Sequence, residues 1–252
     1  MKTKYKSPSL LERVIEWQQE IADQVPYLET PTGLHLGIDF HEKEGYFCTP
    51  VDSFPFAQTG MDGIHFAVLT DFGNADDLSE APVIRVSPMD DERVRLVARN
   101  LHDFFCLYLF DQLLMINEFS SEAQYLESLH QEEADDRDSD WFDHRRWQRE
   151  KAIVREHAQK TFKFAPIDSA FRYIQDIRQE RQAAVSSMTD DTLGVMLLQE
   201  RGLSGQEVKL AAVRNLQAEA CSDKVLVERS ARDLIQMGMA LEAGKLRSRL
   251  LE

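Results

Sequence analysis

The residues best suited to chemistry gather in one stretch, FPFAQTGMDGIHFAVLTDFG, residues 54 to 73. Asp62 and His65 stand three positions apart there, and such a pair could act as an acid–base dyad beside a hydroxyl or thiol nucleophile. The serines, threonines and cysteines of the chain lack the glycine context of a nucleophile elbow. A small hydrolase or ligand-binding enzyme that uses Asp62 and His65 is therefore one alternative for the function.

The same stretch ends in Asp71-Phe72-Gly73, the triplet that holds magnesium in protein kinases. A kinase also needs a glycine-rich phosphate loop, a strand lysine and a His-Arg-Asp catalytic loop before this triplet, and none precedes Asp71. We interpret the triplet as a glycine turn after a strand. Gly60 and the Asp62-Gly63 pair likewise indicate a tight turn, because glycine and aspartate accept left-handed backbone angles.

Metal chemistry has little support in the sequence. Asp136, Asp138 and Asp140 have EF-hand-like spacing, but Trp141 stands where that loop needs glycine and Trp147 where it needs glutamate. The three cysteines are far apart, as expected of free thiols in a reducing compartment. We therefore expect no metal, no cofactor and a cytoplasmic location, since the first residues also lack the apolar core of a secretory signal.

The 252 residues carry a formal net charge of −15, and the charge is uneven. Residues 1 to 120 hold 9 Lys/Arg against 20 Asp/Glu, while residues 121 to 252 hold 20 against 24. An acidic surface repels nucleic acid and anionic membranes, so we expect neither as a partner. A protein partner selected by charge would be basic, although surplus carboxylates can also serve solubility alone.

Hydrophobic periodicity predicts an α+β protein in which an antiparallel sheet of about four or more strands is flanked by helices. The predicted elements are a helix from Ser9 with a capping box to Glu12, strands at 35–40, 46–51, 63–70 and 82–87, and a helix over 94–108. No strand is predicted after residue 120, and capping boxes at Ser121 and Ser204 indicate helices there. Turns are predicted near Pro166, Gly202 and Ser222. We expect an α+β domain over 1–118 and a helical region over 119–252.

Four segments together resemble the SUKH superfamily, which includes a yeast cell-wall-assembly regulator and bacterial immunity proteins. They are the PFA-containing segment 54–57, the DG-initiated strand 62–66, the PV strand 82–86 and the helix-like motif 97–104, all within residues 10 to 112. The resemblance implies an α+β domain that binds other proteins, with no known catalytic residues to carry over to this sequence. Family members of the immunity type neutralise a toxin, often a nuclease, and an acidic face fits a basic partner.

The leading hypothesis is therefore a non-enzymatic protein-binding module that binds a basic toxin domain. Its candidate partner-binding residues are Phe54, Phe56, Asp62, His65, Asp71, Asp76 and Asp77. For the FPF segment, packing beneath the sheet is the competing interpretation. A third hypothesis is a regulatory adaptor that acts through its helical C-terminal half, which could also mediate homo-oligomerisation.

Overall fold

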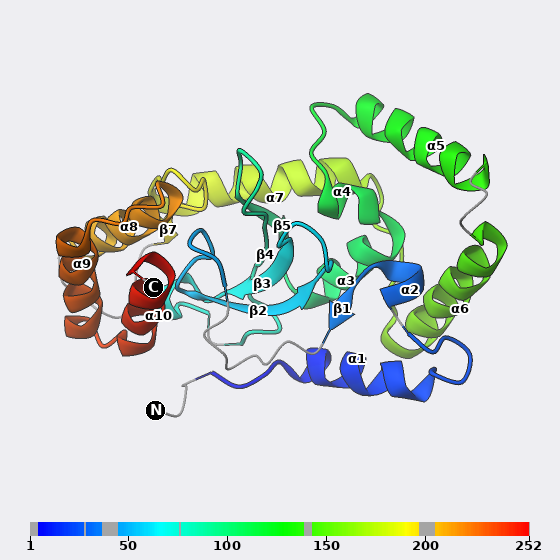
Figure 1. Cartoon of the computed structure of the whole chain (residues 1–252), viewed down its shortest axis with the longest axis horizontal. Coiled ribbons are helices and arrows are strands. Elements are labelled where there is room, and N and C mark those ends of the chain that lie inside the picture. The colour runs from blue at the N-terminus through cyan, green and yellow to red at the C-terminus, as the bar shows by residue number, and fades with distance from the viewer. Residues whose placement is uncertain are drawn as a thin grey trace.

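The protein is α+β, as the sequence predicts. The computed structural model describes residues 5–27, 29–36, 45–75, 77–138, 143–196 and 205–251. These residues form a five-stranded antiparallel sheet of β1 (His35–Leu36), β2 (Ser53–Gln58), β3 (His65–Leu69), β4 (Val83–Val86) and β5 (Val94–Ala98). Each strand pairs with the next one along the chain (Figure 1), so the predicted antiparallel meander is confirmed.

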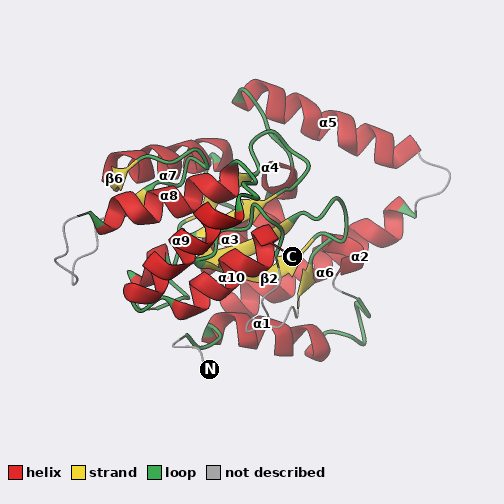
Figure 2. Cartoon of the chain, turned by 60° about the vertical axis from the view of Figure 1, so that its left-hand side comes forward, coloured by secondary structure: helices red, strands yellow, loops and turns green. Residues whose placement is uncertain are grey.

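Helices surround this sheet (Figure 1). Before and directly after it come α1 (Ser9–Glu20), α2 (Glu29–Thr32), α3 (Leu101–Phe110) and α4 (Gln112–Ile116). The helical half contains α5 (Glu122–Asp138), α6 (His144–Phe162), α7 (Ala170–Ala184), α8 (Gln206–Ala218), α9 (Lys224–Gln236) and α10 (Ala240–Leu251). Figure 2 shows α8, α9 and α10 gathered beside the sheet, whereas α5 projects from the body. Within the described ranges, no helix has both the length and the apolar character that a membrane crossing requires.

Both faces of the sheet are buried. Phe66, Val83 and Val97 lie on the face covered by α3 and by α1, α6 and the start of α7. Ile84 and Leu96 lie on the opposite face, which packs against Ile177 of α7 and Leu193. Helices from both sides of residue 118 thus cover the sheet, and this explains why β3 is buried along its whole length instead of alternating between core and solvent.

The predicted strand at 46–51 is wrong. This segment forms turns, in which Thr49 N–H donates to Tyr46 O and Ser53 N–H donates to Pro50 O. The backbone groups that a strand would pair are bonded by C-terminal side chains instead: Gln217 bonds Val51, Phe47 and Thr49, and Arg249 donates to Thr49 O and Pro50 O. The actual partner of β1 is β2. Of the predicted strand 35–40, residues 37–40 lie outside the described residues.

The predicted helix over 94–108 is half wrong, because its first part is strand β5. The apolar spacing of that segment fits a helix and a strand equally well, and pairing of Val94 with Val86 on β4 decides for the strand. Asn100 then acts as the N-cap of α3, where its side chain accepts from Asp103 N at 2.8 Å. The predicted apolar face from Leu101 onward is confirmed as core.

The predicted helix starts are partly confirmed. Ser9 is the first residue of α1 and Pro8 is its N-cap, without a side-chain cap, so the capping box predicted there is wrong. Ser121 Oγ does accept from Gln124 N at the start of α5. Ser204 and Gly202 lie outside the described residues, whereas the connections near Pro166 and Ser222 are confirmed. A short hairpin of β6 (Val185–Ser187) and β7 (Val195–Met196) contradicts the expectation of no strand after residue 120.

Candidate functional site

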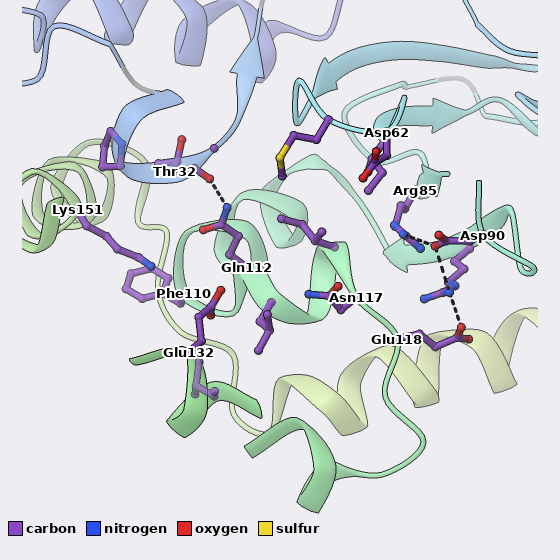
Figure 3. Close-up of a pocket in the computed structure, with 18 of the residues that line it drawn as sticks. Thr32, Asp62, Arg85, Asp90, Phe110, Gln112, Asn117, Glu118, Glu132 and Lys151 are labelled. Carbon is purple, nitrogen blue, oxygen red and sulfur yellow. Dashed lines mark hydrogen bonds and ion pairs between the residues drawn. The ribbon is translucent and has the colours of Figure 1, made fainter. Parts of the chain in front are cut away.

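The candidate functional site is a cleft of about 1070 Å³ at one end of the sheet. Its walls come from α2, the end of α3, α4, α5, α6, strands β4 and β5, the turn before β3 and the loop before β5. Figure 3 shows Asp62, Arg85, Asp90 and Glu118 on one side of the cleft and Phe110, Glu132 and Lys151 on the other. Its volume is that of a site for a sizeable ligand or a segment of another protein.

Two arginines form the sheet side of this cleft. Arg85 on β4 and Arg95 on β5 are directly opposite each other in the strand register, and both side chains are only 3% exposed. Arg85 Nη2 donates to Asp90 Oδ2 at 2.5 Å, and Arg95 Nη2 donates to Glu118 Oε2 at 2.6 Å. Burial lowers the pKa of the Arg85 guanidinium, an effect that the bond to Asp90 opposes. Sequence reasoning missed both arginines, because a lone arginine in a strand has no motif.

The rim of the cleft is acidic. Asp62 and Asp91 are exposed, and Asp90 and Glu118 are partly exposed while they bond the two arginines. The bond to Arg85 lowers the pKa of Asp90, although burial acts in the opposite direction. The Asp90 carboxyl is therefore charged at neutral pH. The rim presents negative charge to anything that approaches the cleft.

The opposite wall of the cleft combines apolar side chains with charged ones, among them Glu132, Lys151 and Arg155. The apolar side chains are Phe110 at the end of α3, Leu113 and Ile116 of α4, Leu129 of α5 and Trp147 of α6. Lys151 lies over the Trp147 ring, with its Nζ 4.1 Å from the ring centroid. A ligand in the cleft would thus meet the two arginines and their acidic partners on one side and a mixed apolar and charged surface on the other.

The turn before β3 places Asp62 at the rim, as the predicted tight turn requires. Asp62 has φ 52 and Gly63 has φ 70, both in the left-handed region. A Cβ added at Gly63 would come within 2.8 Å of the Tyr46 ring, so a side chain at this position would clash as well as strain the backbone. The side chain of Asp62 is left exposed to solvent.

His65 lies inside the fold and does not form a dyad with Asp62. Its Nδ1 is 2.9 Å from Gly63 O and its Nε2 is 3.1 Å from Thr49 Oγ1, so both ring nitrogens have structural partners. The imidazole is 5% exposed, and burial lowers its pKa. The residue holds the turn at 46–49 against β3, and the geometry offers a catalytic dyad no support.

The other predicted partner-binding residues have different locations. Phe54 and Phe56 are in the core at 2% and 0% exposure, so packing, the competing interpretation, describes them. Asp77 is exposed but does not line the cleft, and Asp76 lies outside the described residues. Asp71 is buried and makes a bidentate ion pair with Arg181 at 2.8 and 2.5 Å. Of the six predicted residues that the structure describes, Asp62 alone lines the cleft.

Asp71 belongs to a buried ionic cluster that joins the sheet to the C-terminal helices. Arg214 of α8 donates to Asp52 at 2.7 Å and lies 3.4 Å from Asp191 and 3.8 Å from Asp71. Its guanidinium also covers the Phe72 ring at 5.1 Å. Asp71 and Phe72 of the kinase-like triplet thus serve as anchors for α7 and α8. Sequence reasoning had no signal for pairings between residues more than one hundred positions apart.

A lysine completes the contact between α10 and the sheet. Lys245 Nζ donates to Ser53 O at 2.7 Å and lies 3.9 Å from the centroid of the Phe54 ring. Burial lowers the pKa of Lys245 to about 7, and Arg249 acts in the same direction. Burial also raises the pKa of Asp52 to about 6, against the effect of Arg214.

Among the described residues, no group of three or more His, Cys, Asp or Glu is arranged to hold a metal ion.

No protein-family model matches this chain, and no curated protein is significantly similar to it.

Proposed function

We propose that the protein is a non-enzymatic binding module that captures a basic protein partner at the acidic rim of the cleft. The observation that carries the proposal is the exposure of Asp62 and Asp91 at the rim of a cleft of about 1070 Å³. Complementary charge speeds association and selects among partners. The apolar side chains of Leu129 and Trp147 offer contact area for the same partner.

The SUKH-like segments and the net charge of −15 favour a finer version of this proposal, in which the partner is a toxin domain that the protein neutralises in the cytoplasm. Domains that cleave nucleic acid carry basic residues where they bind the phosphate backbone, so such a partner would be basic. The product of the gene next to that of this chain is the first candidate, because toxin and immunity genes are neighbours in such systems.

The test is capture of that neighbouring gene product by the purified chain at increasing salt concentration. Reversing the rim charges with Asp62→Lys and Asp91→Lys should weaken capture at least tenfold. A matched control reverses Glu12 and Glu16, which are exposed on α1 and do not line the cleft. Equal capture by the rim variant and the control variant, or capture that salt does not weaken, would contradict the proposal.

A regulatory adaptor that self-associates through its helical half is the second candidate. Val208 of α8 and Val225, Leu226 and Ile235 of α9 are exposed apolar side chains on neighbouring helices. Light scattering after size-exclusion chromatography would detect a dimer, and Val225→Asp with Ile235→Asp should dissociate it. A wild-type monomer at high concentration would exclude this candidate.

A further inference from the structure

The two arginines on the sheet side of the cleft, Arg85 and Arg95, are arranged in a way that costs folding free energy. The strand register places Phe66, Arg85 and Arg95 side by side across β3, β4 and β5, so two buried cations face each other beside an aromatic ring. Like charges opposite each other destabilise a sheet, and a buried charge costs free energy unless it is fully paired. Packing of the sheet alone would favour apolar residues at both positions.

The pairing of Arg85 is also incomplete. Its Nη2 contacts Asp90, but within the part of the chain that the structure describes its buried Nε and Nη1 atoms have no hydrogen-bond partner. Buried donors without partners are rare in proteins and call for an explanation such as a bound group. The guanidinium is built to hold a carboxylate through two parallel N–H bonds, and Asp90 uses one donor.

The carboxylates that touch the two arginines are open to solvent. The side chains of Asp90 and Glu118 are 36% and 57% exposed, although their partners are buried. Glu92 lies 3.0 Å from Arg95 Nε, but burial and a hydrogen bond that its protonated carboxyl donates to Glu118 raise its pKa and disfavour its charged form. The acidic side chains therefore occupy positions that an external carboxylate could take with little disruption of the fold.

We propose that Arg85 and Arg95 form a binding site for the carboxylate group of a ligand that also has an apolar part. The apolar part would lie against Leu113, Leu129 and Trp147, since the cleft is far larger than a lone carboxylate needs. Asp62 and Asp91 at the rim disfavour a doubly charged phosphate more than a singly charged carboxylate. A fatty acid and the carboxyl terminus of a peptide share this chemistry.

Binding of two matched pairs of probes to the full chain tests the proposal. The first pair is octanoate and octanamide, and the second is acetyl-Ala-Leu-Leu with a free carboxylate and with a carboxyamide end. Titration calorimetry and NMR shifts at constant ionic strength should show at least tenfold tighter binding of the acid in one pair. The pair that responds distinguishes a fatty acid from a peptide terminus, and inorganic phosphate is titrated as a third arm.

Three variants locate the binding. Asp90→Asn removes the competing carboxylate and should tighten binding of the acid severalfold. Arg85→Lys keeps the charge but loses the planar fork, and it should weaken binding at least tenfold. The control is Arg172→Gln, because Arg172 is exposed on α7 and does not line the cleft. Equal affinity for acid and amide, no binding at millimolar concentration, tighter binding of phosphate, or acid binding unchanged in both cleft variants would overturn the proposal.

Discussion

Arg214 and Asp52 are 162 positions apart in the chain, yet the guanidinium of one donates to the carboxylate of the other at 2.7 Å with both side chains buried. This contact ties α8 to the segment that leads into β2. Phe72 N–H donates to the same carboxylate at 3.2 Å. Arg214 and Asp52 therefore join the segment before β2, the turn at Asp71 to Gly73 and the C-terminal helices.

Loss of this pair should destabilise the whole fold. Arg214→Ala leaves Asp52 and Asp71 buried beside each other with less compensation, and we expect a loss of about 3–5 kcal/mol in the free energy of unfolding. Urea denaturation measures it. Arg172→Ala, which removes an exposed ion pair with Glu122, should cost less than about 1 kcal/mol. Similar losses in the two variants would show that the buried cluster is not a main contact of the fold.

Lys245 should make stability depend on pH above neutrality. Burial lowers its pKa from 10.5 to about 7 in the folded protein, so between these values the unfolded chain holds more protons than the folded one. The free energy of unfolding should then rise with pH across this window, by up to about 1.4 kcal/mol per pH unit. Lys245→Met should flatten that rise in urea denaturation from pH 7 to 9.

Lys209→Met is the matched control for this pH dependence. Lys209 is exposed on α8 and pairs with Asp233, so its removal should leave the slope above pH 7 as it is in the wild type. A wild-type stability that is flat from pH 7 to 9 would contradict the lowered pKa of Lys245.

His65 should behave as a structural residue. His65→Ala removes the contacts to Gly63 O and Thr49 Oγ1, and we expect a loss of about 1–3 kcal/mol in the free energy of unfolding. Asp62→Asn, which removes the carboxylate but keeps a residue that tolerates φ 52 at this exposed position, should change it by less than about 0.5 kcal/mol. Because burial lowers the His65 pKa below 6.5, its NMR titration should be displaced to lower pH. Equal losses of stability in the two variants, or an NMR titration of His65 at its ordinary pH, would contradict the structural role and favour the catalytic dyad.

The fragment of residues 1–118 should not fold by itself. Val154, Phe162 and Phe164 pack into the core that contains Leu107, and Asp71 would lose Arg181. We expect no cooperative thermal unfolding of this fragment and strong binding of a hydrophobic dye. The full chain is the reference. A cooperative transition in the fragment would support the predicted domain boundary at 118, which otherwise stays a prediction.

Strand β5 shows that apolar spacing alone does not distinguish a short strand from a helix. The spacing expected for the apolar face of a helix is shared by Val94, Val97, Ala98 and Leu101. The first three nevertheless lie on β5, and α3 begins at Leu101. A strand of five residues is too short for its period to be distinguished from that of a helix. Asn100, with its affinity for the N-cap position, was the local signal that could have divided the two elements.

The cleft was less accessible to sequence reasoning than the fold. Asp62 could be placed in an exposed turn because glycine and aspartate determine backbone geometry locally. Arg85 and Arg95 could not be recognised, since their juxtaposition depends on the register between β4 and β5. Phe54 is predicted as a partner-binding residue from the sequence, but its ring lies in the core, where Lys245 covers it.

The sequence by itself determined the α+β class, the antiparallel character of the sheet and the turn at Gly60 to Gly63, because these follow from spacing within a few residues and from backbone preferences. Only the tertiary structure decided that residues 46–51 form turns, that Asp71 pairs with Arg181 and that two arginines meet in the floor of a cleft. Those outcomes depend on groups that are far apart along the chain, and a buried backbone group or charge takes whichever partner the folded chain brings to it.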